Sequence, residues 1–467
     1  MWPLVETKGA MIAAAILCRM NNKAWVERDL KHIWHPCTQM HDHEFLPLTP
    51  IIRAEGSWLY DADGKRYLDA VSSWWTNIFG HRHPHIVAAL KRQLDALDHV
   101  IFAGFTHPPA IELAERLCRQ SAMGFSRVFY ADSGSAAVEV ALKMSVQYWQ
   151  NLGQPKRTRF INLSGSYHGE TLGALGVGDV DLYKSQFKEL LIVPITVPSP
   201  DCFGAAAGDW AAHSRQMLKP MEEALARNQG QIAAVIVEPL VQCGGGMRMY
   251  HPDYLTGLRA LCDAHQVHLI ADEIAVGFGR TGTLFACHQA AIAPDFLCVS
   301  KGLTGGTLPL SAVLTGEAIY QAFYDRYETL KGFMHSHSYT GNPLACAAAV
   351  ATLELFEASD VLASNAKLAR HLADQLGQFK DHPNVIDVRQ TGMIAAVELG
   401  PDRSKKVGYP WQERRGLQVY QHGLANGMLL RPLGNVVYFM PPYVITEAEI
   451  EQMVEIAAQG IAVATRD

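Results

Sequence analysis

Short apolar runs alternate with amphipathic segments along the middle of the chain, from residue 127 to residue 316. A strand that is apolar throughout is buried on both faces. Strands of this kind that alternate with helices form a mainly parallel sheet covered on both sides. We therefore predict an α/β fold with a large, mainly parallel sheet. Its strands are expected at 127–132, 159–163, 232–239, 267–273, 295–300 and 310–316, with helices at 135–149, 220–228 and 251–265.

The pattern changes near Ala345. A long helix is expected over 343–359, and the stretch 385–400 then alternates like a partly exposed antiparallel pair. The last helix opens with a capping box, Thr446 with Glu449. The predicted parts are a loosely ordered extension (1–30), the first part of a small α+β domain (31–80), a large ligand-binding domain (81–345) and the rest of the small domain (346–467).

Composition argues against several classes of protein. The 467 residues carry a net charge of −6, and Lys and Arg do not form runs, so we expect neither a nucleic acid nor an anionic membrane surface as partner. No apolar stretch is long enough to span a bilayer. The nine cysteines are scattered without any CxxC pair. This argues against a disulfide framework and a structural zinc site, and it favours the reducing cytoplasm.

The apolar run at 11–18 resembles the core of a signal peptide. It lacks a strongly basic leader and a cleavage site of small residues, and a charged segment follows at once. We therefore expect a tail, or an upstream start codon with Met11 or Met20 as the native first residue, rather than a secretory signal.

Polar side chains follow three of the expected strands at the point where each strand ends. The segment 132–135, Asp-Ser-Gly-Ser, stands at the start of a helix, where backbone N–H groups and the helix dipole suit a phosphate. Asp272 and Glu273 end the next such strand, and Lys301 ends another. Because ligands of parallel sheets bind at the carboxyl ends of the strands, we expect an anion site, a carboxylate and an amine on one rim.

One cofactor uses all three groups. Pyridoxal phosphate has a phosphate for the helix terminus, a basic ring nitrogen for a carboxylate and an aldehyde for a lysine. The glycines after Lys301 are expected to leave its amine room to swing. Taken singly, the three signals have ordinary explanations: a helix N-cap, a lysine that reaches the surface and an aspartate in a turn. Their occurrence on separate strands of one sheet favours the cofactor.

Two other motifs suggest different ligands. GFGRTG at 277–282 matches a dinucleotide-binding pattern with Asp295 as the ribose-binding acid, but a nicotinamide dehydrogenase has no use for Lys301. The histidines of 41–44 and 81–85 lie in loop-like segments without a carboxylate or cysteine that completes a spaced set. We expect these to be solvated loops and predict no metal.

Six motifs together resemble the class III aminotransferases, a branch of the fold-type-I pyridoxal-phosphate enzymes. The resemblance runs from about Ile33 to the last helix and implies a transferase that works as a homodimer with shared active sites. The motifs are ADSGSAAVEVALKM, SYHGET, VEPLVQ, IADEIAVGFGRTG, KGLTGG and HSHSYTGNPLAC.

The resemblance implies a role for each cofactor residue. Lys301 is the lysine that binds the aldehyde carbon, and Asp272 pairs with the ring nitrogen. Gly134 and Ser135 hold the phosphate, and Tyr167 stacks on the ring. Two residues of the HSHSYTG segment complete the cofactor set, Ser338 reaching the phosphate from the partner subunit and His337 beside it.

Three further stretches, HIWHP, SSWW and RPLGNVVYFMPPY, resemble the biotin-pathway branch of that family. This branch aminates 8-amino-7-oxononanoate to 7,8-diaminononanoate, with S-adenosylmethionine as the usual donor and lysine in some members. The resemblance implies that Arg431 binds the substrate carboxylate and that Trp74 and Trp75 wall the pocket, with Trp74 touching the substrate. The residues themselves agree, because an alkyl chain with a terminal carboxylate needs an apolar wall and a distant cation. Core packing is the alternative for the two tryptophans. The other substrate-binding residues expected are Cys37, Arg280, Ser336 and Tyr438.

The chain departs from the family pattern at two places. Cys37 stands where a tyrosine is common, and a thiol is a much weaker hydrogen-bond donor, so the amino donor could differ, unless a water fills the gap. The segment at 335–338, HSHS, replaces a Gly-Pro-Thr stretch, and Ser338 keeps the hydroxyl. An ω-amine or ornithine-type transaminase, an aminomutase, or a non-catalytic cofactor-binding protein remain as alternatives.

Overall fold

The computed structural model describes residues 20–205 and 208–466. The apolar run at 11–18 and the alternative start at Met11 lie outside the described residues. Within the described parts of the chain, no helix combines the length and the apolar composition needed to cross a membrane.

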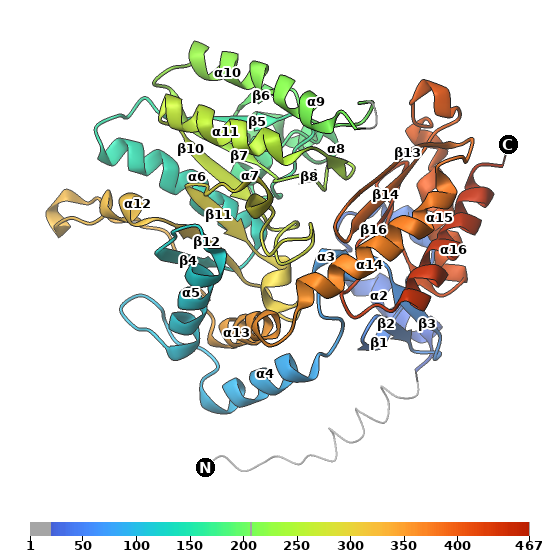
Figure 1. The fold of residues 1–467 in the computed structure, drawn as a ribbon. Coiled ribbons are helices and arrows are strands. Elements are labelled where there is room, and N and C mark those ends of the chain that lie inside the picture. The colour runs from blue at the N-terminus through green and yellow to red at the C-terminus, as the bar shows by residue number, and fades with distance from the viewer. Residues whose placement is uncertain (1–19, 206–207, 467) are drawn as a thin grey trace.

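A seven-stranded sheet forms the centre of the larger part of the molecule (Figure 1). Its strands, in spatial order, are β4 (Arg127–Ala131), β12 (Ser311–Thr315), β11 (Phe296–Val299), β10 (His268–Asp272), β7 (Ile232–Val237), β5 (Arg159–Leu163) and β6 (Ile195–Val197). Neighbours from β11 to β6 run parallel, which confirms the mainly parallel sheet. The strand expected at 310–316 differs, because β12 runs antiparallel to both β11 and β4. Since β12 reverses the direction twice, β4 again points the same way as β11, and their carboxyl ends meet at one edge.

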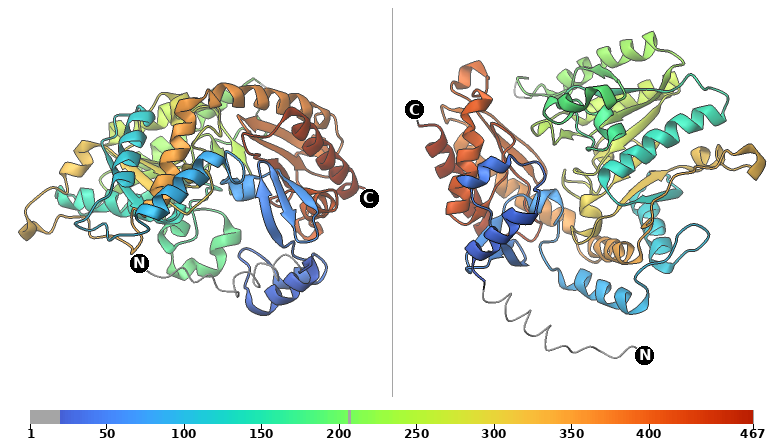
Figure 2. Two further views of the ribbon diagram at one scale, coloured as in Figure 1. Left: turned by 90° about the horizontal axis from the view of Figure 1, so that it is seen from below. Right: turned by 180° about the vertical axis from the view of Figure 1, so that it is seen from behind.

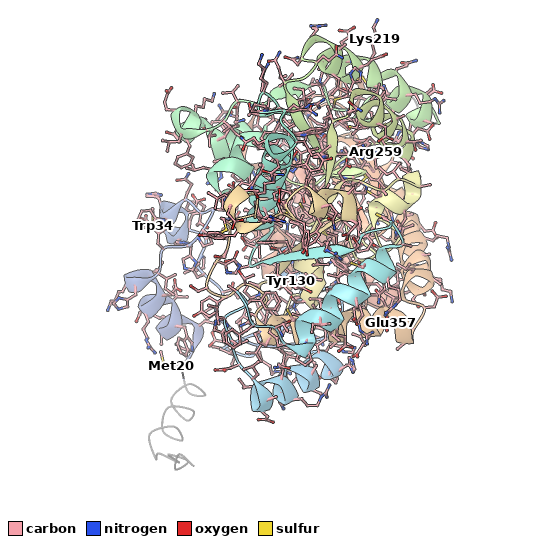
Figure 3. All side chains as sticks on the ribbon, turned by 90° about the vertical axis from the view of Figure 1, so that its left-hand side faces the viewer. Met20, Trp34, Tyr130, Lys219, Arg259 and Glu357 are labelled. Carbon is pink, nitrogen blue, oxygen red and sulfur yellow. The ribbon has the colours of Figure 1, made fainter. Side chains whose placement is uncertain are left out.

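Helices cover both faces of this sheet because its strands are apolar on both faces. Alternate residues of one strand show this: Ile236 packs with α6 (Gly134–Asn151), whereas Val235 belongs to the core on the other face. The helices that contribute to that second core include α5 (Pro108–Ser121), α10 (Leu218–Arg227) and α11 (Pro252–His265). Tyr130 of β4 lies in the interior of the molecule (Figure 3). Its hydroxyl donates to the carbonyl of Ala110 at 2.7 Å.

The smaller part of the molecule holds two further sheets. Strands β1 (Ile51–Glu55), β2 (Trp58–Asp61) and β3 (Arg66–Asp69) are antiparallel, and β15 (Met428–Leu429) joins them by pairing with β3. Strands β13 (Val385–Thr391), β14 (Ile394–Leu399) and β16 (Val436–Phe439) form an antiparallel sheet. N-terminal and C-terminal segments therefore lie side by side, as both views of Figure 2 show. The domain limits themselves stay a prediction.

The capping box of the last helix is confirmed. In α16 (Glu447–Ala464) the hydroxyl of Thr446 accepts from the N–H of Glu449 at 3.2 Å, and Oε2 of Glu449 accepts from the N–H of Thr446 at 2.8 Å. The remaining helices and short strands are α4 (Pro84–Ala96), α7 (Leu172–Val177), α8 (Asp181–Lys184), β8 (Val241–Gln242), β9 (Arg248–Met249), α9 (Trp210–Gln216), α12 (Glu317–Gln321), α13 (Pro343–Ala358), α14 (Val361–Leu376) and α15 (Arg415–Ala425).

The expectation of loose order over 1–30 is wrong for its last part. Helix α2 (Asn22–His32) begins at an N-cap, Asn21, whose side chain accepts from the N–H of Ala24. The Asn22 side chain donates to Oδ2 of Asp61 at 2.9 Å, which fastens the helix to the turn after β2. The signal that was missed is the Asn-Asn pair, which suits a helix N-terminus.

Candidate active site

A cavity of about 150 Å³ lies where the carboxyl ends of β4, β7, β10 and β11 meet. This is the edge at which the sequence placed its polar strand ends. The cavity walls are Ser133–Ser135 at the start of α6, the loop residues 167–169, Glu238, Asp272, 274–276, Lys301 and Trp75.

Lys301 leaves the end of β11 in a left-handed conformation, with φ of 43°. Its Nζ lies 5.0 Å from the centroid of the Trp75 ring. Burial lowers the pKa of its ammonium group, and the negative charge of Asp272 partly opposes this. A lysine in this setting is neutral more often than one in water, so it suits attack on a carbonyl carbon and proton transfer.

The glycines after Lys301 serve close packing rather than only flexibility. Gly306 has φ of 79°, and a Cβ at this position would lie 2.7 Å from the backbone N of Asn77. The turn after Lys301 therefore rests directly on the segment that follows Trp75.

Asp272 is paired with a histidine that the sequence analysis did not single out. Nδ1 of His168 lies 2.8 Å from Oδ2 of Asp272, and Oδ1 accepts from the N–H of Ile274 at 3.1 Å. Both side chains are buried. The imidazole therefore fixes the orientation of the Asp272 carboxylate in the cavity wall. Among the described residues, Nε2 of His168 has no hydrogen-bond partner.

Glu238 is a second carboxyl group in the cavity wall that was not predicted. Its Oε2 accepts from the N–H of Tyr167 and its Oε1 from the N–H of Cys243, both at 2.9 Å. Burial raises its pKa to about 7, with the nearby Asp272 adding to the rise and His168 opposing it. The reasoning applied to Asp272 would have found it, because Glu238 follows the apolar strand β7.

The other strand-end carboxylate, Glu273, faces away from the cavity. Its two oxygens accept from the N–H groups of Ala286 and Cys287 at 2.6 and 2.8 Å. It is fully buried and holds the loop after β10 in place. Of the Asp272–Glu273 pair, only Asp272 can meet a ligand.

The start of α6 borders the cavity, where the sequence analysis expects an anion to bind. The hydroxyl of Ser133 caps the helix by accepting from the N–H of Ala136 at 3.3 Å. The hydroxyl of Ser135 accepts from the N–H of Glu170 at 3.1 Å. The loop approaches so closely that a Cβ on Gly169 would lie 2.0 Å from Oγ of Ser135. Gly134 stands between these serines, so free N–H groups at a helix N-terminus border the cavity.

Tyr167 lines the cavity with an aromatic ring, and residues 274–276 line it with aliphatic side chains. Its hydroxyl donates to Oε1 of Glu170 at 2.9 Å, and burial raises its pKa. Its ring also lies 5.3 Å from that of Tyr183. A planar ligand between Tyr167 and the 274–276 segment would be held on both faces.

The two adjacent tryptophans of α3 (Ser72–Trp75) have different surroundings. Trp75 is 5% exposed, lines the cavity and donates from Nε1 to the hydroxyl of Tyr438 at 3.0 Å. Trp74 is 40% exposed, and the guanidinium carbon of Arg431 lies 4.4 Å from the centroid of its ring. Trp75, rather than Trp74, therefore borders the cofactor cavity. Tyr438 is buried behind Trp75 and supports it.

Cys37 and Arg431 meet at the outer side of this site. Nη2 of Arg431 donates to the carbonyl of Cys37 at 3.5 Å, and the Cys37 thiol lies 3.9 Å from Oε1 of Glu170. Partial burial and the charge of Glu170 raise the thiol pKa. Glu170, which the sequence analysis did not single out, thus brings a carboxylate to the mouth of the cavity.

Arg280 does not line the cavity. It is fully buried, and its Nη1 donates to the carbonyls of Pro441 at 2.6 Å and Met440 at 3.4 Å. Burial lowers the pKa of its guanidinium. Its expected contact with substrate stays a prediction, and the geometry assigns it first to supporting the 440–441 segment.

Ser336, His337 and Ser338 lie in the loop before α13, and they do not line the cavity of their own chain. Ser336 and Ser338 are exposed, while the His337 N–H donates to Oγ1 of Thr340 at 3.2 Å. Their expected contact with the cofactor across a subunit interface stays a prediction.

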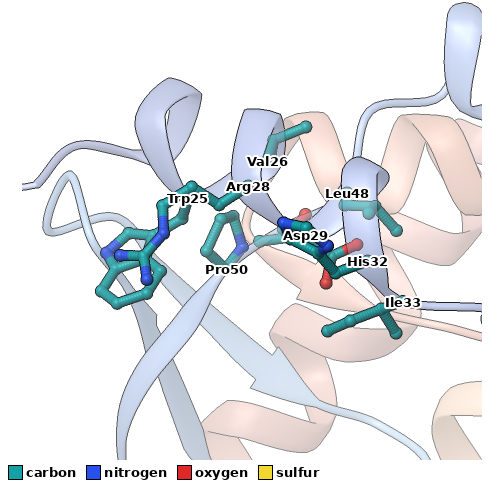
Figure 4. A pocket seen from close by; sticks show the side chains of 9 residues that line it. Trp25, Val26, Arg28, Asp29, His32, Ile33, Leu48 and Pro50 are labelled. Atoms are coloured by element: carbon teal, nitrogen blue, oxygen red, sulfur yellow. The ribbon is translucent and has the colours of Figure 1, made fainter.

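A separate hollow of about 340 Å³ lies beside α2 (Figure 4). Trp25, Arg28, Asp29, His32, Leu48 and Pro50 are among the residues that line it. Nε2 of His35 lies 2.6 Å from Oδ1 of Asp29, and the Arg28 guanidinium lies 5.0 Å from the Trp25 ring centroid. None of the residues predicted to bind cofactor or substrate lines this hollow.

The residues at the sheet edge fit pyridoxal phosphate. An anion site at a helix N-terminus, a buried carboxylate held by His168, an aromatic wall and a buried lysine surround one cavity. Phosphate, ring nitrogen, ring face and aldehyde each find a group of suitable chemistry.

Comparison with known proteins gives consistent results. The family described as Aminotransferase class-III matches residues 39–461. The adenosylmethionine-8-amino-7-oxononanoate aminotransferase of Geobacter sulfurreducens is 44% identical over 91% of this chain and 95% of its own. The crystal structure of the enzyme of that name from Methanocaldococcus jannaschii aligns with a TM-score of 0.90 and 36% identity, over 96% of this chain and 100% of that one. An amine transaminase from an uncultivated Pseudomonas species, solved with pyridoxal phosphate bound, aligns with a TM-score of 0.88 and 34% identity, over 92% and 98%.

Proposed function

Because the chain belongs to the class III aminotransferases, which use pyridoxal phosphate, we propose that it aminates 8-amino-7-oxononanoate to 7,8-diaminononanoate in biotin biosynthesis. The observation that carries this substrate is the pair of neighbouring tryptophans between the amine of Lys301 and the guanidinium of Arg431. Trp75 lies beside Lys301, and Trp74 lies under Arg431. A substrate with a ketone at one end, an alkyl chain and a carboxylate at the other matches this order of amine, apolar wall and guanidinium.

Each cavity residue has a task toward the cofactor. Gly134 and Ser135 would hold the phosphate, and Asp272 would keep the ring nitrogen protonated. Bound pyridoxal phosphate supplies an electron-accepting ring and a carbonyl through which an amino group passes from donor to acceptor. Lys301 would bind the carbonyl carbon and then carry the α-proton on Nζ, a task that its lowered pKa favours.

We propose S-adenosylmethionine as the amino donor, with lysine as the alternative. Both donors carry a cationic amine, and the carboxylate of Glu170 stands at the cavity mouth beside the Cys37 thiol. The cofactor absorbance distinguishes the two donors, because its visible band is lost when the amino group is transferred to it. Purified protein is titrated with each donor separately. Conversion by lysine alone would replace S-adenosylmethionine in this proposal.

A second candidate is an ω-amine transaminase with the same cofactor site. The likeness to the Pseudomonas amine transaminase supports it, since that enzyme shares 34% identity with this chain. The test compares kcat/KM for 8-amino-7-oxononanoate with kcat/KM for simple aldehydes under one donor, with the diamine product measured by mass spectrometry. Good turnover of aldehydes with none of 8-amino-7-oxononanoate would favour the second candidate.

The proposal includes a homodimer with shared active sites. Ser336 and Ser338 are exposed in their own chain, and large apolar side chains are exposed nearby in the 320–339 region and around 101–105. A second copy of the chain would cover such apolar surface. The proposed location is the cytoplasm, which agrees with eight unpaired cysteines in the described residues.

A further inference from the structure

Residues 72–75 form a left-handed helical turn. Their φ values are 48°, 46°, 82° and 75°, and none of the four residues is glycine. The N–H of Trp75 still donates to the carbonyl of Val71 at 2.8 Å, and the N–H of Thr76 to that of Ser72 at 2.9 Å, so the turn is closed like a helix of the opposite hand. Each such residue costs roughly 1–2 kcal/mol relative to a right-handed one. Four in a row persist only where the surroundings hold them.

Asp69 is the main residue that holds the 72–75 turn in its left-handed conformation. This aspartate at the end of β3 has no exposed surface. Its Oδ1 accepts from the N–H of Ser73 at 2.9 Å and from that of Val71 at 3.3 Å. Its Oδ2 accepts from the hydroxyl of Ser73 at 2.7 Å, and Nε2 of His81 lies 2.9 Å from it. One carboxylate therefore binds the turn at its start and at its centre.

A second anchor comes from the far end of the chain. The hydroxyl of Ser72 donates to the carbonyl of Met440 at 2.8 Å, and the N–H of Met440 donates to the carbonyl of Ala70 at 2.9 Å. The turn is thus fixed between β3 and the residue that follows β16.

The hand of the turn decides where the two indole rings point. In this turn Trp75 points inward to Lys301 and Tyr438, while Trp74 points outward to Arg431. A right-handed turn over the same residues would rotate consecutive side chains in the opposite sense, so both rings would leave these partners. The relative position of the reacting end and the carboxylate end depends on this turn.

We propose that Asp69 is a positioning residue that sets the enzyme's selectivity for long keto acids, by holding the 72–75 turn in its left-handed form. This inference rests on the proposed function, because it assumes an acceptor that reaches from Lys301 to Arg431. Asp69 does not border the cavity, so it acts through Trp74 and Trp75.

The test compares Asp69→Asn with Asp61→Asn. The asparagine keeps the size of Asp69 but puts an NH₂ group in place of one accepting oxygen, so two of the four donors lose their acceptor. Asp61 is a matched control, since its buried carboxylate accepts from the N–H groups of Asp63 and Lys65 in a turn away from the cavity. A milder pair is His81→Ala with His81→Gln, in which the glutamine retains a donor for Asp69.

In Asp69→Asn we expect KM for 8-amino-7-oxononanoate to rise roughly tenfold or more, the size expected from losing hydrogen bonds to a charged group. The preference for the nine-carbon acid over a homologue shortened by two methylenes should fall by a similar factor. The rate of the donor half-reaction should change less than that of the acceptor half-reaction, because only the acceptor is proposed to reach from Lys301 to Arg431. The visible circular dichroism of the bound cofactor should change, because Trp75 moves. His81→Gln should recover more of the chain-length preference than His81→Ala.

An unchanged chain-length preference in Asp69→Asn and His81→Ala would overturn the proposal, and so would equal changes in Asp61→Asn. If wild-type protein does not aminate 8-amino-7-oxononanoate at all, the proposed function fails instead. The circular dichroism comparison then still reports whether Asp69 positions Trp75.

Discussion

At the scale of single residues, the reacting lysine is placed by backbone conformation and burial together. Lys301 turns out of β11 with φ of 43°, a conformation that costs roughly 1–2 kcal/mol for a residue with a side chain. The hydroxyl of the preceding Ser300 donates to the carbonyl of Leu310 at 2.7 Å and fixes the strand end. As a result, the amine enters the cavity near Asp272 instead of continuing along the strand.

Replacing this lysine by alanine should abolish both the visible absorbance of the bound cofactor and turnover. The reason is that the described cavity wall contains no other lysine that could bind the aldehyde carbon. The measurement is an absorbance spectrum and a transamination assay of Lys301→Ala beside Lys91→Ala, an exposed control on α4. Normal turnover in Lys301→Ala would remove this residue from the mechanism.

Glu273 predicts a pH dependence of stability. Burial raises its pKa to about 7 from 4.5, so the folded state binds more protons than the unfolded state between these values. Its contribution is fully present below pH 4.5 and is lost as the pH rises through 7. The slope approaches about 1.4 kcal/mol per pH unit and sums to about 3 kcal/mol.

The stability advantage of wild type over Glu273→Gln should therefore shrink steadily from pH 5 to pH 8, measured as the urea midpoint of the apoprotein. The amide cannot ionise, and its poorer contacts with Ala286 and Cys287 lower stability equally at every pH. Glu27→Gln, on the exposed face of α2, should show no such trend relative to wild type. A constant difference between wild type and Glu273→Gln across this range would contradict the prediction.

Whether a site residue could be predicted from the sequence depends on whether it ends a strand or lies within a loop. Asp272 and Lys301 are local signals, because each ends an apolar strand and the topology brings such ends together. Glu238 obeys the same rule and could have been predicted. His168 and Glu170 lie within a loop, and nothing local indicates which of its polar residues turns toward the sheet. The contacts of His168 with Asp272 and of Glu170 with Cys37 become known only from the folded structure.

At the scale of elements, a glycine-rich loop connects the C-terminal sheet to the cavity wall. Arg389 of β13 donates from Nη2 to the carbonyl of Gly246 at 2.6 Å and from Nε to that of Met247 at 2.7 Å. The loop has no spare room, since a Cβ on Gly244 would lie 2.5 Å from Cβ of Tyr167. By binding these two carbonyls, Arg389 keeps the loop packed against Tyr167, which lines the cavity.

Replacing Arg389 by methionine should lower both stability and cofactor affinity. Asp387 and Glu398 each lie 2.7 Å from Nη1. The substitution would leave Asp387 without this partner, while Glu398 keeps its ion pair with Arg248, so the cost should be at most about 3–5 kcal/mol. The loosened loop should also weaken cofactor binding about tenfold, a factor that corresponds to about 1.4 kcal/mol. The measurements are the unfolding temperature of the apoprotein and the dissociation constant for pyridoxal phosphate.

Arg157→Met is the matched control for Arg389→Met. Arg157 is also a buried arginine that donates to main-chain carbonyls, those of Ile232 and Gln266, at the opposite edge of the sheet. It should destabilise the protein while cofactor affinity is kept. If both variants bind the cofactor equally well, the link from β13 to the cavity is wrong.

The direction of β12 and the left-handed turn at 72–75, neither of which the sequence analysis predicted, have one cause in common. The strand β12 has the composition of its parallel neighbours, and its direction is set by the short connection from Lys301, which leaves no length for a crossover helix. The left-handed turn at 72–75 has no local signal, because serine and tryptophan do not favour positive φ. Its anchor on Met440 lies 368 residues away in the chain. The spacing of apolar residues in the sequence indicates local burial and carries no information on contacts between distant parts of the chain.

At the scale of the whole molecule, the site is made from distant parts of the chain. Trp75 comes from the N-terminal segment, Lys301 from the central sheet and Arg431 from the C-terminal part. The pairing of β3 with β15 explains how the first and third of these meet. The loop of Ser336 and Ser338 is the exception, since it does not line the described cavity that holds Lys301. The proposed dimer gives this loop a purpose.

Mixed dimers test directly whether Ser338 completes the cavity of the partner subunit. Two tagged chains, Lys301→Ala and Ser338→Glu, are produced together, and the heterodimer is isolated by both tags. The glutamate repels the cofactor phosphate, so each homodimer should be inactive. If Ser338 acts across the interface, one site of the heterodimer has an intact lysine from one chain and an intact serine from the other. Its activity should then be about half that of wild type, because one of its two sites is complete.

The control heterodimer pairs Lys301→Ala with Asp272→Ala, both within one chain's cavity, and should stay inactive. An inactive Lys301→Ala/Ser338→Glu heterodimer of normal size would mean that Ser338 does not complete the partner's site.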